Sequence, residues 1–171
     1  MMRKILVHLL VLLLLCPARS VLAATPDSAD ILQFFYLTYS PLGQADWHTE
    51  EITFHGSFTA EQEAYLLMDD FFTSGLAVSV PQGVSVIGVK IEEDTLTVNV
   101  SRQILQYGGT ANENILLAQF LKTALDMPGI HKVTLLVDSF LRPLPEGSLI
   151  REATTWSDYA QEAENLSGPS D

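Results

Sequence analysis

Cysteine and positive charge are the two scarcest features of this sequence. Its 171 residues include one cysteine, Cys16, and nine Lys and Arg against 21 Asp and Glu, for a formal net charge of −12. A chain without paired cysteines forms no internal disulfide, so its hydrophobic core must hold the fold together. Nucleic-acid binding depends on clustered Lys and Arg, and the acidic balance therefore excludes nucleic acid as an expected partner.

Residues 1–23 have the layout of a secretory signal peptide. Arg3 and Lys4 form a positive start, and residues 5–15 are an apolar run interrupted only by His8. That run is shorter than the ~20 residues that a membrane-spanning helix needs. We therefore predict an exported protein, secreted or held in the cell envelope, with no stable membrane span after the leader is removed.

Cleavage is expected between Ala23 and Ala24, where small residues follow the apolar run. It removes three of the nine basic residues and none of the 21 acidic ones, so the formal charge of the mature chain falls to −15. Lipidation at Cys16 is the alternative, although Leu15 stands where a lipoprotein signal has a small residue. Residues 24–30 are small and polar, as in a short tether.

Two segments have the spacing of amphipathic helices, because their apolar residues recur at offsets of 0, 3, 4, 7 and 8. These residues are Ala64, Leu67, Met68, Phe71 and Phe72 in the first segment, and Leu117, Phe120, Leu121, Ala124 and Leu125 in the second. A capping-box spacing precedes each segment, with Thr59 and Gln62 in the first and Thr110 and Glu113 in the second. Gly75 is placed to end the first helix.

Strand patterns alternate with these helices. Residues 31–39 predict a buried aromatic strand and residues 51–55 a short one; residues 84–92 and 95–100 predict a hairpin, and residues 132–138 a last strand. This order predicts the α/β (α+β) class, a mixed β-sheet with two amphipathic helices packed on it. We expect one domain over residues 31–150 and an acidic, partly disordered tail over residues 151–171.

A family resemblance rests on two short motifs in the second half of the chain. TVNVS at residues 97–101 ends the predicted hairpin, and VTLLVD at residues 133–138 forms the last predicted strand. In this order and spacing, and over residues 31–150, the chain resembles the GerMN domain of sporulation and spore germination proteins. The resemblance implies an α/β module outside the cytoplasmic membrane, similar to ring-building modules, without catalytic residues. Such modules act by protein–protein association, so it implies envelope or sporulation proteins, or a second copy, as partners.

Two patterns imitate chemical sites. The loop at residues 108–110 (GGT) precedes a helix, as in a phosphate cradle, but Ala111 stands where a phosphate loop has Lys. Ser101 or Ser139 with His131 and Asp138 offers the residue types of a nucleophilic triad, yet no G-x-S-x-G motif is present. We therefore predict no catalytic and no cofactor-binding residues, and leave an unrecognised hydrolase as the weakest alternative.

The histidines, the acidic turn and the aromatic residues also match parts of binding sites. His48, His55 and His131 lack the close spacing of a zinc site, and the acidic turn at residues 92–94 lacks the spacing of a calcium loop, so no metal is predicted. Aromatic residues could line a groove for a peptide or a glycan, or form core: Phe34, Phe35, Tyr36, Tyr39 and Trp47. The leading hypothesis is a non-catalytic envelope module acting by association, and the alternative is a module that binds peptidoglycan or another wall polymer.

Overall fold

The computed structural model describes residues 30–40 and 44–160. The predicted signal peptide, Cys16, the cleavage site at Ala23 and Ala24, and the rest of the tether up to residue 29 lie outside these residues, as does the tail from residue 161. Within the described ranges, no helix has the length and apolar character needed to cross a membrane.

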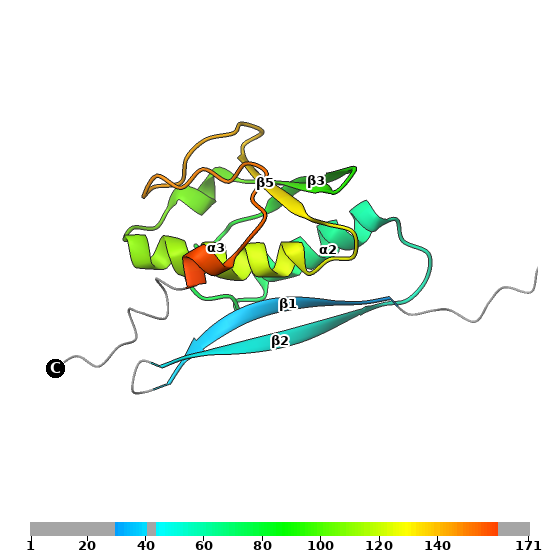
Figure 1. Cartoon of the computed structure of the whole chain (residues 1–171), viewed down its shortest axis with the longest axis horizontal. Helices are drawn as coiled ribbons and strands as arrows, with labels where there is room; N and C mark the ends of the chain where they lie inside the picture. Colours follow the sequence, from blue (N-terminus) through cyan, green and yellow to red (C-terminus); the bar gives the residue numbers. More distant parts are fainter. Residues whose placement is uncertain (1–29, 41–43, 161–171) are drawn as a thin grey trace, which may run out of the picture.

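The described chain forms three layers (Figure 1). Its elements are β1 (Asp30–Tyr39), β2 (Ala45–Phe54), α2 (Ala60–Thr73), β3 (Val86–Glu92), β4 (Thr95–Val100), the short 3₁₀ helix η1 (Arg102–Leu105), α3 (Thr110–Leu125) and β5 (Lys132–Val137). The helices lie between the antiparallel β1–β2 hairpin and a three-stranded mixed sheet in the order β3-β4-β5, in which β4 and β5 are parallel. The predicted α+β class is confirmed, but the strands form two sheets where one was predicted.

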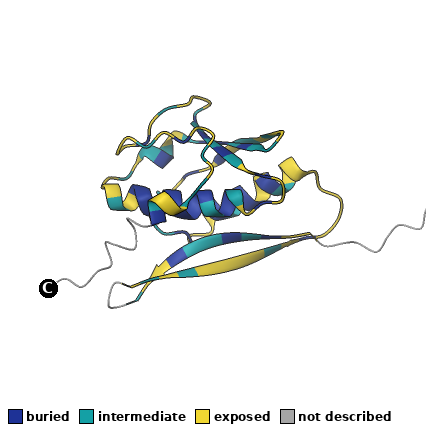
Figure 2. Cartoon of the chain, in the orientation of Figure 1, coloured by how far each residue is buried: buried dark blue, intermediate teal, exposed yellow. Residues whose placement is uncertain are grey.

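The β1–β2 hairpin is longer and more exposed than its sequence indicated. The strand predicted at residues 51–55 begins at Ala45, because β2 pairs with β1 along ten residues in continuous register. Most of β2 is exposed, as Figure 2 shows, so its conformation comes from this pairing and not from an apolar pattern. In β1 only Leu32, Phe34 and Leu37 are buried, so the strand is half-buried and not a central one.

Helix α2 forms as predicted. The amide of Gln62 donates to Thr59 Oγ1 at 3.3 Å, and the amide of Thr59 donates to Gln62 Oε1 at 2.9 Å, which completes the capping box. The buried residues of α2 are the five predicted from the apolar offsets. Gly75, with φ +77°, follows the C-cap and turns the chain away, as expected of a glycine in this position.

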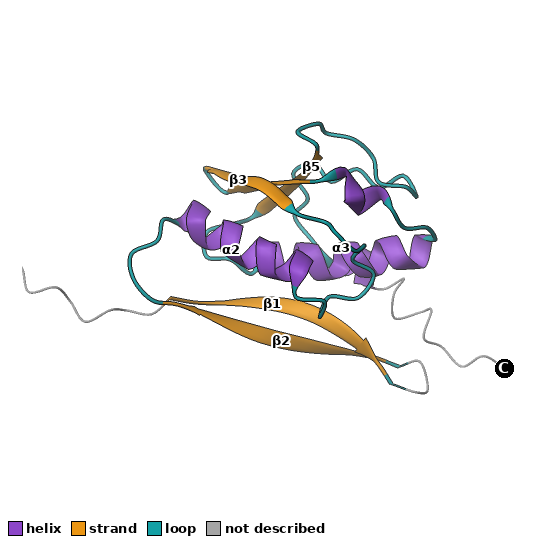
Figure 3. Cartoon of the chain, turned by 180° about the vertical axis from the view of Figure 1, so that it is seen from behind, coloured by secondary structure: helices purple, strands orange, loops and turns teal. Residues whose placement is uncertain are grey.

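Helix α3 differs from its prediction at its start and in its burial. The helix begins after Gly109, and Glu113 is 1 % exposed, so the predicted second capping box is absent. The Glu113 carboxylate instead accepts from the Tyr107 hydroxyl at 2.9 Å and from the amides of Glu146 and Ser148 at 2.8 and 2.9 Å. Helix α3 lies between the two sheets (Figure 3). Because it packs on both, nearly every side of it is buried from residue 113 to residue 124.

Candidate functional site

The triad suggested by the sequence is not assembled. His131 precedes β5 and Asp138 follows it, so the six-residue strand separates them by on the order of 20 Å. The carboxylate of Asp138 accepts from Arg102 Nε at 2.7 Å, and Ser101 Oγ accepts from the amide of Ser85 at 3.0 Å. These residues stabilise turns at the end of the sheet and share no reactive centre.

The glycine loop before α3 already has an anionic partner within the chain. The amide of Gly109 donates to Glu146 Oε1 at 2.8 Å, and Thr110 Oγ1 donates to Glu146 Oε2 at 3.4 Å. A carboxylate of the chain thus lies where a phosphate would bind a helix N-terminus. The loop joins α3 to the segment after β5.

Two acidic side chains of the turn between β3 and β4 form ion pairs with different lysines. Glu92 pairs with Lys90 at 2.6 Å, and Asp94 pairs with Lys132 at 3.2 Å. The hydrogen bond from Lys132 is the main reason why the pKa of Asp94 lies below its usual value. Over the part of the chain that the structure describes, no three His, Cys, Asp or Glu side chains are placed to hold a metal ion.

The predicted aromatic residues do not form an open groove. Phe34 is fully buried in the main core. Phe35 and Trp47 turn toward Lys122, whose Nζ lies 4.4 and 5.5 Å from their ring centres and 4.2 Å from that of Trp156. Lys122 fills the space among these rings. Its cation–π contacts hold the segment around Trp156 against the hairpin.

The remaining predicted residues lie on the surface of the hairpin and at strand ends. His48 lies in β2 and stacks on Tyr36 with ring centres 5.5 Å apart. Tyr39 is the last residue of β1 and is partly exposed. His55 directly follows β2 and is exposed.

Among the described residues the two sheets have four edges, and two of these are covered by other parts of the chain. Along β1, the amides of Phe35 and Leu37 donate to Thr123 Oγ1 and Gln119 Oε1 of α3, at 2.9 and 2.8 Å. Along β5, the later chain runs beside the strand, and the amide of Leu135 donates to the carbonyl of Ile150 at 3.0 Å. Neither edge is open to another strand.

The other two edges are protected by charge and by local geometry. On β3, the amide of Ile91 donates to Glu61 Oε1 at 3.0 Å, the Tyr65 hydroxyl donates to the carbonyl of Val86 at 3.5 Å, and a bulge interrupts the register between Val86 and Gly88. The outer edge of β2 has no strand beside it among the described residues, but the strand carries three acids. Charges and bulges of this kind discourage strand addition.

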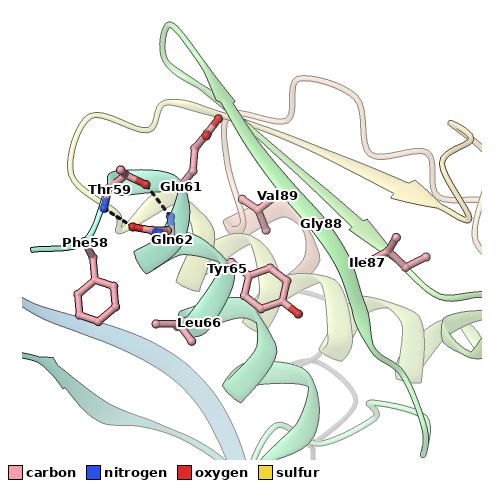
Figure 4. Close-up of a pocket in the computed structure, with 9 residues that line it drawn as sticks. All are labelled: Phe58, Thr59, Glu61, Gln62, Tyr65, Leu66, Ile87, Gly88 and Val89. Carbon is pink, nitrogen blue, oxygen red and sulfur yellow. Dashed lines mark hydrogen bonds between the residues drawn. The ribbon is translucent and has the colours of Figure 1, made fainter.

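An apolar groove between α2 and β3 is the strongest candidate site (Figure 4). Its volume is about 680 Å³, and the lining residues are Phe58, Thr59, Glu61, Gln62, Tyr65, Leu66, Ile87, Gly88 and Val89. Four of them are large hydrophobic residues that are 38 % to 51 % exposed: Phe58, Tyr65, Leu66 and Ile87. The one charged side chain in the lining is that of Glu61. We call this site the α2/β3 groove.

Local structure explains why these side chains face outward. The capping box fixes where α2 begins, and the buried stripe through Leu67 and Phe71 turns Tyr65 and Leu66 toward solvent. The bulge next to Gly88 leaves Ile87 exposed on the strand side of the groove. The groove was not predicted from the sequence. Tyr65 and Leu66, two apolar residues outside the predicted buried stripe of α2, were the sequence feature that indicated it.

Residues 54–139, half of the chain, match the Germane family, described as sporulation and spore germination. The chain belongs to this family. It is similar in structure to the first GerMN domain of the sporulation protein GerM from Bacillus subtilis, with TM-score 0.51 and 19 % identity over 74 % of this chain and 97 % of that one. The α2/β3 groove lies within the matched residues.

A second structure of GerM shows how the chain compares with a longer protein. The tandem GerMN domains match with TM-score 0.54 and 20 % identity over 77 % of this chain, which spans about half (48 %) of the tandem structure. At this identity the likeness shows the fold, which confirms the resemblance to the GerMN domain. Comparison with curated protein sequences found no match.

Proposed function

We propose that this chain is a non-catalytic, exported protein of the cell envelope that serves sporulation or spore germination by binding another protein. Membership of the Germane family supports a role in sporulation or spore germination. The leader-like residues 1–23 support export. The residues that imitate a triad and a phosphate loop have structural partners instead, which favours a binding role.

The observation that carries this proposal is the α2/β3 groove. Contiguous exposed apolar side chains in a concave surface mark interaction sites in soluble proteins. A Tyr beside Leu, Ile and Phe is the composition of an interface core, where a few such residues supply most of the binding free energy. Because Glu61 and Tyr65 occupy polar groups of the β3 edge, the groove fits an inserted apolar side chain of a partner polypeptide better than an added strand.

The wall-polymer alternative loses its main support. It rested on the exported location and on the aromatic residues of the first strand. Of these, Phe34 packs in the core, Phe35 packs against Lys122 and Tyr36 stacks on His48, which leaves Tyr39 exposed. In the lining of the α2/β3 groove, Thr59 and Gln62 bond each other in the capping box, and Glu61 and Tyr65 bond the β3 backbone, so these polar side chains already have partners within the chain. Protein association is therefore the function that the site supports best.

Complementation in cells that lack the gene tests this function. Leu66→Asp places a charge in the groove and is expected to abolish the restoration of heat-resistant, germinating spores. Leu76→Asp is the matched control, because Leu76 is a similarly exposed leucine just beyond α2 and outside the groove. Circular dichroism establishes that both variants fold. Equal complementation by the two variants would refute a role for the groove.

Export is tested separately from binding. The mass of the protein recovered outside the cytoplasm should correspond to residues 24–171 if cleavage occurs between Ala23 and Ala24. A lipid-modified species beginning at Cys16 would show that the anchored alternative applies instead.

A further inference from the structure

A strained turn follows β5 at the end of the VTLLVD motif. Asp138 and Ser139 have φ angles of 49° and 67°. The residues on either side, Val137 and Phe140, exchange backbone hydrogen bonds of 2.9 and 3.1 Å. Two consecutive positive φ angles are those of a type I′ turn, which favours Asn or Asp followed by Gly, so Ser139 is the unfavourable residue in this turn. Such strain persists only where surrounding contacts enforce it.

Four side-chain hydrogen bonds hold the turn in place. The Asn99 amide group donates to Ser139 Oγ at 3.0 Å and accepts from the Ser139 amide at 2.8 Å. The amide and Nε of Arg102 donate to the Asp138 carboxylate at 3.2 and 2.7 Å. Asn99 and Asp138 belong to the TVNVS and VTLLVD motifs, so these motif residues hold the turn in its conformation.

The locked turn presents an exposed aromatic side chain. Phe140 is 63 % exposed, more than any other large hydrophobic residue in the described ranges. Leu141 is also exposed, and the Arg142 guanidinium lies 5.4 Å from the centre of the Phe140 ring. We call Phe140, Leu141 and Arg142 the knob. A rigidly held aromatic beside an arginine is typical of an interface anchor, since little conformational freedom is lost on binding.

We propose that the knob of one copy of this chain binds the α2/β3 groove of a second copy. The inference rests on the proposed function of the groove and names its partner. The groove offers apolar side chains to Phe140 and the carboxylate of Glu61 to Arg142, so the two surfaces match in both polarity and charge.

The sheet order sets the geometry of this contact. The groove lies along β3, the knob follows β5, and these strands are the two opposite edges of the three-stranded sheet. In Figure 1 the segment after β5, drawn in gold, extends beyond the sheet on the side away from the β1–β2 hairpin. A knob therefore meets the groove of another copy, in a head-to-tail contact that joins different surfaces of the two copies.

A membrane is a weaker match for the knob. Arginines beside exposed apolar residues attract anionic lipid, but that attraction depends on clusters of several Lys and Arg, and the knob has a single arginine, Arg142. Insertion into lipid also requires no fixed backbone conformation, whereas the turn is held by four hydrogen bonds. A shaped protein surface accounts for the rigidity of the turn.

Sedimentation of the exported protein over a wide concentration range tests the contact. The mass of the wild type should rise with concentration. Phe140→Asp removes the knob and Leu66→Asp blocks the groove, and each variant alone should associate at least about 10-fold more weakly. An equimolar mixture of the two should form a dimer, because one intact knob and one intact groove remain. Leu76→Asp should behave as the wild type.

Two results would overturn the inference. The first is a wild type that is monomeric at every concentration; if it binds phosphatidylglycerol vesicles through Phe140, the knob binds lipid instead. The second is a mixture that stays monomeric while the wild type associates, since it indicates a symmetric contact. If the wild type is monomeric but Leu66→Asp fails in complementation, only the identity of the partner is wrong. Full complementation by Leu66→Asp refutes the proposed function itself.

Discussion

The side chain of Gln119 is expected to be the most sensitive polar group in the fold. It is fully buried and connects α3 to two other segments. Its Oε1 accepts from the amides of Leu37 and Val78 at 2.8 and 3.2 Å. Its Nε2 donates to the carbonyls of Val78 and Ile115 at 2.8 and 3.0 Å. The amide group thus uses both donors and both acceptor positions.

Gln119→Leu keeps the side-chain volume but removes the partners of three backbone groups outside α3. The carbonyl of Ile115 lies in the interior of α3, where it retains a helical partner. A buried polar group without a partner costs about 1–3 kcal/mol of stability. Val78 is half-buried, so the loss for its amide and for its carbonyl lies at the low end of this range. The expected loss is about 3–5 kcal/mol, out of a total stability of ~5–15 kcal/mol for a domain.

Thr123→Val is the matched comparison, one helical turn further along α3. It removes only the hydrogen bond from the amide of Phe35, so we expect a loss of about 1–2 kcal/mol. Urea unfolding followed by circular dichroism gives both values. The protein concentration must be low, because self-association would raise the apparent stability. If Gln119→Leu costs no more than Thr123→Val, the argument that Gln119 joins the layers is wrong.

Three further changes have defined outcomes. Thr59→Ala removes the capping box of α2 and should lower the free energy of unfolding by about 1 kcal/mol in urea. Burial raises the pKa of Glu113, but hydrogen bonds, first from Ser148, outweigh it and hold the pKa below its usual value. The Glu113 carboxylate therefore stabilises the fold above the unfolded pKa of ~4.3, and the stability difference between Glu113→Gln and wild type should shrink as pH falls through the folded pKa. Trp156→Ala removes a ring 4.2 Å from Lys122 Nζ, and should red-shift the emission of the one remaining tryptophan and expose the C-terminal segment to protease.

Helix α2 and the strands of the β3–β4 hairpin could be read from the sequence. Thr59 and Gln62 specify where α2 begins, and the apolar offsets specify its buried face. In β4, Leu96, Val98 and Val100 are buried and alternate with half-buried residues, as their spacing predicted. These features depend on contacts a few residues apart along the chain, which is why a single sequence contains them.

The contacts of Glu113 and the conformation of the knob depend on parts of the chain that are distant in the sequence. Glu113 had the spacing of a capping residue, but donors more than thirty residues away, at Glu146 and Ser148, draw its carboxylate elsewhere. The knob takes its conformation from Asn99, about forty residues earlier in the chain.

The sequence by itself determined the class of the fold, the position of its most regular elements and the family motifs. Only the tertiary structure decided that α3 lies between two sheets, that β2 starts at Ala45, and that the outward side of α2 and the bulged edge of β3 meet as a groove. Periodicity shows which face of an element is apolar, but it does not show which other element covers that face. That choice depends on the packing of the whole chain.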